Sequence, residues 1–317
     1  MTELLAHRLI VITGKGGTGK TTVATALGLL AAGRGLRTIV VEVGHQDRLS
    51  ALFSDAAANP GRELRLQENL WTLSIDPDTA LEEWLALLGG RVAARVLSQS
   101  GSFQYFAAAA PGAKELVSMV KLWELSESKR RRGVSEGYDV VLLDAPATGH
   151  ALAMLHSPVT FGAIARVGAV ATQTQRVRAL LTDPARTSYL AVAAPTEMAV
   201  SETLQLQREL RAQVGAELHA VVVNGVLPRR FAERELRDVE ALDGPLAGAA
   251  AAAARAVHER ARSQHNQLAR LRRRDVRVVS VPFQFTAQLD LDTLRRIAAQ
   301  LGRGLADAAD PKRGRRA

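Results

Sequence analysis

The fold is decided by one stretch near the N-terminus, Leu9-Ile10-Val11-Ile12-Thr13-Gly14-Lys15-Gly16-Gly17-Thr18-Gly19-Lys20-Thr21-Thr22. It opens with an apolar, β-rich run, which is typical of a strand buried on both faces. The apolar positions after the glycines, from Thr21 to Ala32, have helical spacing. A glycine-rich loop between a buried strand and a helix predicts a phosphate site, because free backbone amides and the positive end of the helix meet there.

The loop satisfies the GxxxxGK[ST] pattern, and each part of that pattern has a chemical role. Glycines let the backbone turn tightly enough for successive N–H groups to surround phosphate oxygens. Lys20 can reach the β and γ phosphates of a nucleoside triphosphate, and the Thr21 hydroxyl can complete a magnesium shell. The predicted phosphate-binding residues are Gly14, Lys15, Gly16, Gly17, Thr18, Gly19, Lys20, Thr21 and Thr22.

Strands and helices alternate through most of the chain. Predicted strands follow at Thr38–Val43, Leu70–Ile75, Asp139–Asp144, Ser188–Ala193, Leu218–Asn224 and Val276–Val281. Helical patterns separate them, among them Ser201–Gln213 and Glu233–Arg262. This alternation predicts an α/β fold: a P-loop protein with a mainly parallel sheet covered by helices on both faces.

Two helical segments interrupt the predicted core and form an insertion subdomain. The organisation we predict is a core in three parts (1–78, 137–150 with one strand and the loop after it, and 183–310), helical segments at 79–136 and 151–182, and a basic, disordered tail at 311–317.

Composition excludes several classes of protein. The chain has 317 residues, 47% of them hydrophobic and 23% charged, which is ordinary for a globular protein. Cysteine is absent, so disulfides, thiolate zinc sites and cysteine nucleophiles are excluded. There is no uncharged apolar run long enough for a membrane span and no signal-peptide pattern at the start, so we expect a cytoplasmic protein.

The net charge of +9 comes from arginine, since only six of the 41 basic residues are lysines. Such charge permits weak contact with nucleic acid. Aromatic residues make up only 4% and are not interleaved with the arginines, so we expect no specific nucleic-acid partner.

A second phosphate-facing element is the strand that ends in Asp144. An acid at the carboxyl end of a strand lies where ligands bind in open α/β sheets, and from there it can hold a magnesium-bound water. We therefore predict Thr21 and Asp144 as the magnesium residues.

The second lysine of the loop, Lys15, makes the motif resemble the deviant Walker A pattern KGGxGK[ST] of the MinD/ParA/nitrogenase-iron-protein/arsenite-pump class. In that class the early lysine reaches the partner's nucleotide across a dimer interface. The resemblance therefore implies an ATP-dependent dimer, with a solvent-exposed Lys15 of no special role as the alternative.

Four further segments resemble the arsenite-pump ATPase and Get-pathway tail-anchored-protein targeting ATPase family, in its short bacterial branch. Asp144–His150 resembles its D-T-A-P-T-G-H switch II segment, Pro111–Leu116 its P-G-x-x-E helix start, Ala194–Thr203 its P-E…Y-E-T stretch, and Val222–Pro228 its V-V-N-x-L-L-P segment. The resemblance implies that Asn224 contacts adenine and that Pro282 and Phe283 lie in the loop closing over the base. It also implies a Mg-ATP-dependent ATPase.

The chain departs from that family at two points. Gly44 aligns with the aspartate that orients the attacking water. Asp47 or Glu42 could substitute, and we take Asp47 as the catalytic candidate beside Lys15 and Lys20. Slow or absent hydrolysis, as in the inactive subunit of a heterodimer with a paralogue, is the alternative to a homodimeric enzyme. Without cysteine, neither a thiol site for arsenite nor a zinc clamp between subunits can form.

The apolar residues of the helical segments have two interpretations. They form either a groove for a hydrophobic protein or membrane client, opened and closed by nucleotide, or a plain helical core. Likewise the last predicted helix, Leu289–Leu305, either packs on the sheet or binds a membrane as an amphipathic helix. A ParA/MinD-like partitioning ATPase that retains DNA through its arginines is the remaining alternative.

Overall fold

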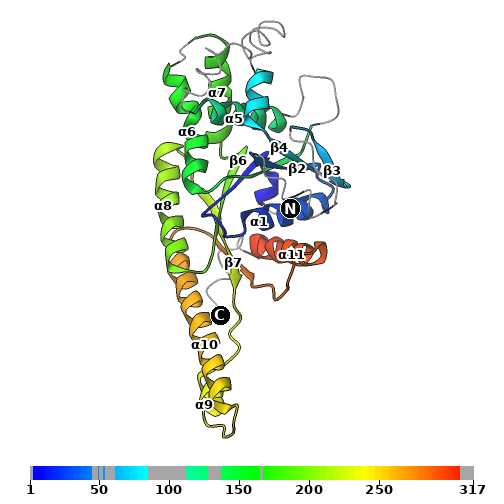
Figure 1. Cartoon of the computed structure of the whole chain (residues 1–317). Helices are drawn as coiled ribbons and strands as arrows, with labels where there is room; N and C mark the ends of the chain where they lie inside the picture. The colour runs from blue at the N-terminus through cyan, green and yellow to red at the C-terminus, as the bar shows by residue number, and fades with distance from the viewer. Residues whose placement is uncertain are drawn as a thin grey trace.

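The computed structural model describes residues 3–44, 49, 53, 61–84, 112–127, 137–164 and 167–307. Within these residues the strands form a single eight-stranded sheet in the order β3-β4-β2-β5-β1-β6-β7-β8 (Figure 1). The strands are β1 Leu9–Thr13, β2 Thr38–Val43, β3 Leu64–Gln67, β4 Leu70–Ile75, β5 Val140–Asp144, β6 Thr187–Ala193, β7 Leu218–Val226 and β8 Val278–Pro282.

Every neighbouring pair in the sheet is parallel except the edge pair β3–β4. The central strands β1, β5 and β6 are buried along their whole length. A strand buried on both faces must be apolar on both, which is why these segments read as continuous hydrophobic runs. The predicted α/β class with a mainly parallel sheet is confirmed.

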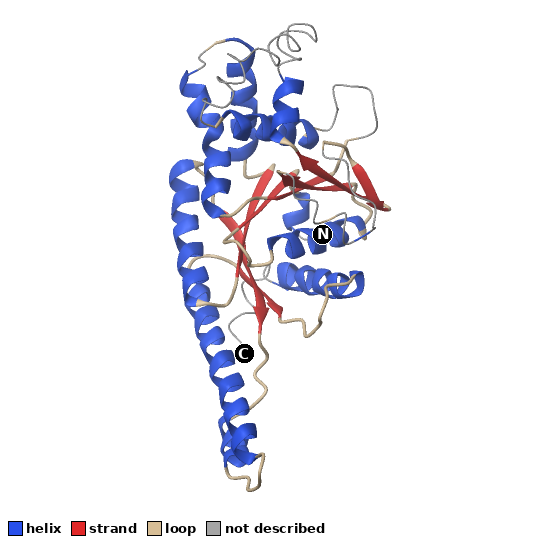
Figure 2. Cartoon of the chain, in the orientation of Figure 1, coloured by secondary structure: helices blue, strands red, loops and turns tan. Residues whose placement is uncertain are grey.

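Helices cover both faces of the sheet (Figure 2). The described helices are the 3-10 turn η1 Glu3–Ala6, and α1 Lys20–Ala32, α5 Ala113–Ser126, α6 Thr148–Ile164, α7 Gly168–Thr182, α8 Glu197–Gln213, α9 Glu233–Glu240, α10 Ala247–Arg272 and α11 Leu291–Asp307. One apolar core lies under α1 and α11, and the other lies under α5, α6, α7, α8 and the end of α10.

The last helix packs within the fold. Leu294, Ile297 and Leu301 on α11 are fully or almost fully buried, and α11 lies against α1 and β8. The amphipathic pattern of this helix is therefore explained by the core that it covers. In the described residues no helix is long and apolar enough to cross a membrane.

Two features differ from the sequence-based expectation. The edge strand β3 was not predicted, because its LRLQ sequence is short and only half-buried. The helix predicted from Glu233 to Arg262 is two helices, α9 and α10, separated at Gly244 and Pro245. Gly244 has a φ of 128°, and a proline in the interior of a helix breaks it. The break between α9 and α10 is therefore caused by the backbone conformation of these two residues.

The helices α9 and α10 form an arm that extends away from the sheet (Figure 1). They are tied together where the Arg255 guanidinium donates to Glu240 Oε1 from Nε at 3.0 Å and from Nη2 at 2.6 Å. The arm is anchored to the body where the Leu227 amide donates to Gln264 Oε1 at 2.7 Å. Only the end of α10 nearest the sheet contributes large buried side chains, Leu268 and Leu271.

Candidate functional site

The glycine-rich loop lies between β1 and α1 and is shaped by its glycines. Gly14, Gly17 and Gly19 have φ values of 145°, 80° and 91°, which L side chains rarely adopt. A Cβ on Gly14 would also collide with the backbone carbonyl oxygen of Val192, and one on Gly19 with the Asn224 side chain. The loop thus packs closely against the ends of β6 and β7.

The lysine and threonine of the motif lie at the first turn of α1. Lys20 Nζ donates to the Lys15 carbonyl oxygen at 3.2 Å, and Thr21 Oγ1 donates to Asp144 Oδ2 at 2.6 Å. Asp144 is 8% exposed and ends β5, which lies directly beside β1. The structure therefore brings together the lysine, the hydroxyl and the acid that were predicted separately.

Hard oxygen donors at this point fit a magnesium ion. Mg²⁺ prefers carboxylate, hydroxyl and water oxygens and binds through one or two carboxylates together with substrate phosphates. Thr21 and Asp144 supply one hydroxyl and one carboxylate in contact with each other, beside the loop that would hold the phosphates. Among the described residues there is no group of three or more His, Cys, Asp and Glu side chains that could hold a metal by protein ligands alone.

The early lysine of the loop is held within its own chain. Lys15 Nζ lies 2.6 Å from Glu202 Oε1 and 2.8 Å from Met198 Sδ, both on α8. Both side chains of the ion pair are 39% exposed. The sequence pointed to Lys15 but missed its partner, because Glu202 lies 187 residues further along the chain.

A hollow of about 480 Å³ opens beside this ion pair. It lies between the phosphate loop, the segment after Asp144 and one face of α8. Its lining residues are Lys15, Gly16, Ala147, Thr148, Gly149, Glu202, Gln205 and Glu209. One wall is therefore acidic, and the other carries the lysine ammonium.

The segment after Asp144 runs straight into a helix. Ala145 is buried against the sheet, and Thr148, Gly149 and His150 form the first turn of α6. If the segment after Asp144 moves, the first turn of α6 therefore moves with it. His150 is exposed at that turn.

The predicted base-binding residues lie together at the ends of β7 and β8. Asn224 Nδ2 donates to the Thr18 carbonyl oxygen at 3.0 Å, so its amide braces the phosphate loop. Pro282 ends β8, and the Phe283 amide donates to Val226 O at 2.9 Å. The Phe283 ring is 47% exposed, which leaves an aromatic face open to a ligand.

Beyond β2, the region expected to orient the attacking water is described only in part. Gly44 has a φ of 95°, and its carbonyl oxygen accepts from Ser74 Oγ at 2.5 Å. Asp47, the predicted catalytic acid, lies outside the described residues. Glu42, the other candidate, is 3% exposed at the end of β2.

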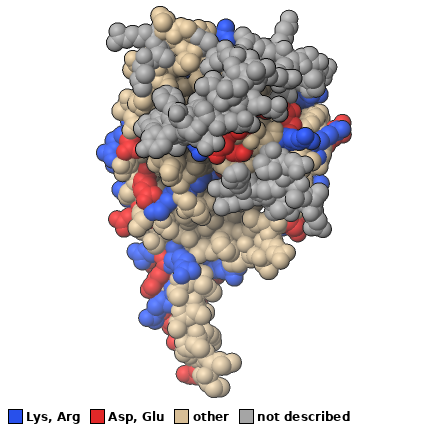
Figure 3. Space-filling view, turned by 45° about the horizontal axis from the view of Figure 1, so that its top comes forward, with Lys and Arg blue, Asp and Glu red and all other residues tan. Residues whose placement is uncertain are grey.

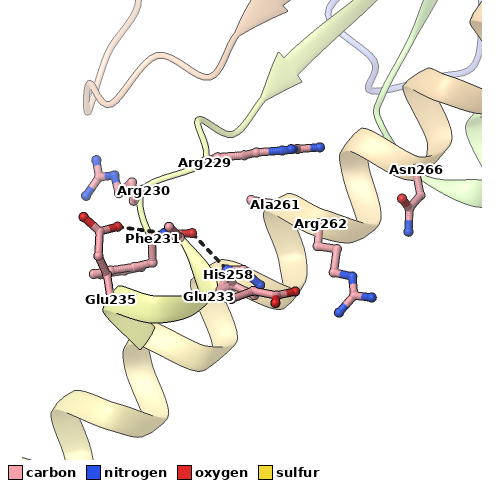
Figure 4. Close-up of a pocket in the computed structure, with 10 residues that line it drawn as sticks. Arg229, Arg230, Phe231, Glu233, Glu235, His258, Ala261, Arg262 and Asn266 are labelled. Atoms are coloured by element: carbon pink, nitrogen blue, oxygen red, sulfur yellow. Dashed lines mark hydrogen bonds between the residues drawn. The ribbon is translucent and has the colours of Figure 1, made fainter. Parts of the chain in front are cut away.

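A second hollow, of about 530 Å³, lies at the base of the arm and was not predicted (Figure 4). It is open between the loop after β7 and α10. Its lining residues are Arg229, Arg230, Phe231, Ala232, Glu233, Glu235, His258, Ala261, Arg262 and Asn266. In Figure 4 Arg229 and Arg262 point in different directions, so their guanidinium groups do not converge on one ligand.

Many apolar side chains of the helical segments pack into the core. Met119, Trp123 and Met154 are 9% exposed or less, and Phe161 packs against the same core. The Trp84 indole donates to the Gln173 side chain. Phe103, Tyr105 and Phe106, which were candidates for a client groove, lie outside the described residues.

The fold and the loop together define an ATPase of the P-loop class. The model of the anion-transporting ATPase family matches residues 7–166 and 159–243 of the chain. The chain belongs to this family, and it is an ATPase of the group that includes arsenical pump-driving and GET3 ATPases. The resemblance inferred from the motifs is confirmed.

Individual relatives agree with that assignment. The chain is 31% identical over 244 residues to ATPase BagA of Mycobacterium tuberculosis, covering 74% of this chain and 69% of that protein. It is 26% identical over 262 residues to ATPase GET3 of Eremothecium gossypii, covering 72% and 74%. It is 28% identical over 244 residues to a putative arsenical pump-driving ATPase of Halobacterium salinarum, covering 71% and 36%.

Proposed function

We propose that the protein binds Mg-ATP as a dimer and that the nucleotide state rearranges its helical subdomain. In this proposal Lys20 and the backbone of residues 14–22 hold the phosphates, Thr21 and Asp144 hold magnesium, and Asn224, Pro282 and Phe283 contact the base. Bound magnesium would neutralise phosphate charge. The helical subdomain comprises 79–136 and 151–182, and the remaining ranges of the core, 1–78, 137–150 and 183–310, form the ATPase unit.

The single observation that carries the proposal is the continuity from Asp144 to α6. Asp144 contacts Thr21, and α6 begins four residues later at Thr148. The helices α5, α6 and α7 contact one another, so a displaced α6 start moves them as a group. A γ phosphate that repositions this segment therefore has a direct mechanical route to the subdomain.

Dimerisation is supported by the loop's second lysine and by the hollow beside it. Lys15 is partly exposed, and a partner's nucleotide approaching the hollow would meet its ammonium. In a dimer Lys15 of one subunit would then neutralise phosphate charge on the other, as in enzymes that complete a site in trans. Either two identical chains or a chain and a paralogue satisfy this arrangement.

A hydrophobic protein or membrane segment is the client class that we propose. Val167, at the turn between α6 and α7, is 86% exposed, and it belongs to the subdomain that α6 would move. No thiol ligand for a metalloid exists in the chain, so a soft metalloid is not proposed as cargo.

Hydrogen–deuterium exchange with and without Mg-ATPγS tests the coupling. We expect the amides at the start of α6, together with those of α5 and α7, to change protection when the nucleotide binds. The variant Thr21→Ala, which removes the hydroxyl beside Asp144, should bind nucleotide without that change. Protection changes confined to the phosphate loop would contradict the proposal.

A hydrolysis-impaired subunit of a heterodimer is the second candidate, and Gly44 favours it. Its φ of 95° suits glycine, and an aspartate there would carry strain of about 1–3 kcal/mol. Single-turnover hydrolysis at high protein concentration separates the two candidates. Activity in the unaltered chain that is lost in Asp47→Asn supports the enzyme, whereas inactivity that Gly44→Asp relieves supports the impaired subunit.

A further inference from the structure

Glu42 is a buried carboxylate that the proposed contacts to the nucleotide do not use. It is 3% exposed at the end of β2 and is in register with Asp144 on the neighbouring strand β5. Two residues earlier, Val40 and Leu142 are also in register and pack in the core beneath α1. Side chains two apart on a strand share a face, so Glu42 and Asp144 both point to the α1 side of the sheet.

The contact made by Asp144 identifies what lies next to Glu42. Thr21 Oγ1, at the first turn of α1, donates to Asp144 Oδ2 at 2.6 Å. Parallel neighbours in a sheet are about 4.8 Å apart, so the Glu42 carboxylate is one strand away from the proposed magnesium residues. Two buried carboxylates this close stabilise a divalent cation and are destabilised without positive charge nearby.

Glu42 also contacts the segment that follows Gly44. The Leu49 amide donates to Glu42 Oε2 at 3.4 Å, and the Leu49 side chain is fully buried. One carboxylate therefore links the magnesium side of the site to Leu49, which follows Gly44 in the chain.

The position of Glu42 excludes it from orienting the attacking water itself. Gly44, which aligns with the missing aspartate, lies two residues further toward the ligand edge of the sheet. A strand advances about 3.3 Å per residue, so the Glu42 backbone lies roughly 6–7 Å behind that position. The one extra methylene of glutamate adds only about 1.5 Å of reach, whereas an orienting group must lie within about 3 Å of the water.

We propose that Glu42 is a positioning residue of the magnesium site and couples metal binding to Leu49. This inference rests on the proposed binding of Mg-nucleotide and names a third protein group, beyond Thr21 and Asp144, on which the cation depends. In this proposal the acidic side chain of β2 is Glu42, and position 44 carries none. The Glu42 carboxylate is placed to support the metal, and it is too far back along the strand to orient the attacking water.

The affinity of the protein–ATPγS complex for Mn²⁺, measured by electron paramagnetic resonance, tests the proposal. Loss of an outer-shell partner typically weakens metal binding by 10–100-fold, so Glu42→Gln should raise the Mn²⁺ dissociation constant about 10-fold or more. The matched control is Asp139→Asn, at the opposite end of β5, where the carboxylate accepts from the Arg37 amide at 2.9 Å. The control should leave Mn²⁺ affinity unchanged.

A second measurement on the same proteins tests whether Glu42 responds to the metal or only packs in the core. Exchange of the Leu49 amide should slow when Mn²⁺ is added to the unaltered ATPγS complex and should not slow in Glu42→Gln. If Glu42→Gln fails to fold, Glu42→Asp keeps the charge with a shorter reach and should show an intermediate loss of affinity. Equal Mn²⁺ affinity in the folded Glu42 variant and the unaltered chain would overturn this proposal alone, whereas failure of the unaltered chain to bind ATPγS would overturn the proposed function.

Discussion

At the scale of single residues, position 14 requires glycine for two separate physical reasons. Its φ of 145° is rarely open to other residues, and an added Cβ would collide with the Val192 carbonyl oxygen, which belongs to a central strand and cannot move aside. Gly16, two residues on, has neither constraint, since a Cβ added there would meet no atom within 4 Å. Gly14 is therefore required by sterics, as is Gly19, whereas Gly16 is not.

We expect Gly14→Ala to destabilise the protein by roughly 1–3 kcal/mol, from backbone strain and the collision with the Val192 carbonyl, and to weaken nucleotide binding. Gly16→Ala should leave the free energy of unfolding within about 0.5 kcal/mol of the unaltered value. Urea unfolding followed by circular dichroism measures both. Equal destabilisation by the two variants would be inconsistent with the loop geometry described.

His219 gives the protein a pH-dependent stability. Burial, and then the neighbouring Arg277 guanidinium, lower the pKa of His219 below its ordinary value of 6.5. Below about pH 6.5 the unfolded chain therefore takes up a proton that the folded chain resists, and the stability of the fold falls as the pH drops.

The free energy of unfolding should therefore decrease from pH 7.5 to pH 5.5 by more in the unaltered protein than in His219→Gln. Urea unfolding at the two pH values measures the difference. A loss of stability that is the same in both proteins would show that other groups cause it.

The sequence predicted the contiguous loop and the pairing of Thr21 with Asp144, but it did not predict other long-range contacts of the candidate site. Residues 14–22 form one contiguous pattern, so their joint role follows from spacing. The pairings of Lys15 with Glu202 and of Asn224 with Thr18 join residues 187 and 206 positions apart. Which side chains meet across such distances depends on the packing of α8 and β7, and local patterns carry no information about it.

At the scale of elements, α11 supports the helix that starts at the phosphate loop. Leu294 on α11 is fully buried in the core shared with α1, whereas Arg303 on the same helix is exposed. Removing the Leu294 side chain leaves a cavity in that core. We expect Leu294→Ala to cost about 2–5 kcal/mol and Arg303→Ala to change stability little, as measured by thermal and urea unfolding. A small effect of Leu294→Ala would mean that α11 is only loosely attached.

The elements that sequence analysis predicted correctly are those with a buried face. The strands β1, β2 and β4 have the predicted bounds, because continuous apolar runs identify strands buried on both sides. The strand β3 and the division of α9 from α10 were missed, because these segments bury little and no apolar period marks their ends. The spacing of apolar residues also gave no indication of how elements are placed in the fold, for example that the arm extends away from the sheet.

At the scale of the whole molecule, the arm is the part of the described chain with the least support from the core. Figure 1 places α9 and the start of α10 beyond the sheet, and Leu242 and Leu246 at its tip are 57% and 76% exposed. Figure 3 shows Lys and Arg interspersed with Asp and Glu on the face in view.

Amide hydrogen exchange should be slow where apolar contacts hold the backbone and fast where they are few. We expect amide protection in α10 to decline from Leu271, beside the sheet, toward Ala247 at the tip, because local opening is easiest where few apolar contacts are lost. Protection in β1 and β6 should be the highest in the molecule. Uniform protection along α10 in the isolated protein would mean that the arm is held by contacts not seen in the single chain.

The ion pair of Lys15 and Glu202 would compete with the dimer contact that we propose for Lys15. In the proposed dimer, Lys15 Nζ would exchange its Glu202 partner, 2.6 Å away, for a phosphate of the other subunit's nucleotide. We therefore expect Glu202→Gln to increase ATPγS-dependent dimerisation several-fold, measured by analytical ultracentrifugation. Glu209→Gln, on the same wall of the hollow, is the control and should have little effect. Weaker dimerisation in Glu202→Gln would instead mean that Glu202 supports the dimer.

Titration calorimetry of ATPγS in the presence of Mg²⁺ tests the central claim most directly. The account predicts saturable binding to the unaltered chain, loss of that binding in Lys20→Ala, and retention of binding in Lys114→Ala, a lysine in an exposed ion pair with Asp78. Unchanged affinity in Lys20→Ala, or no binding by the unaltered chain, would contradict it.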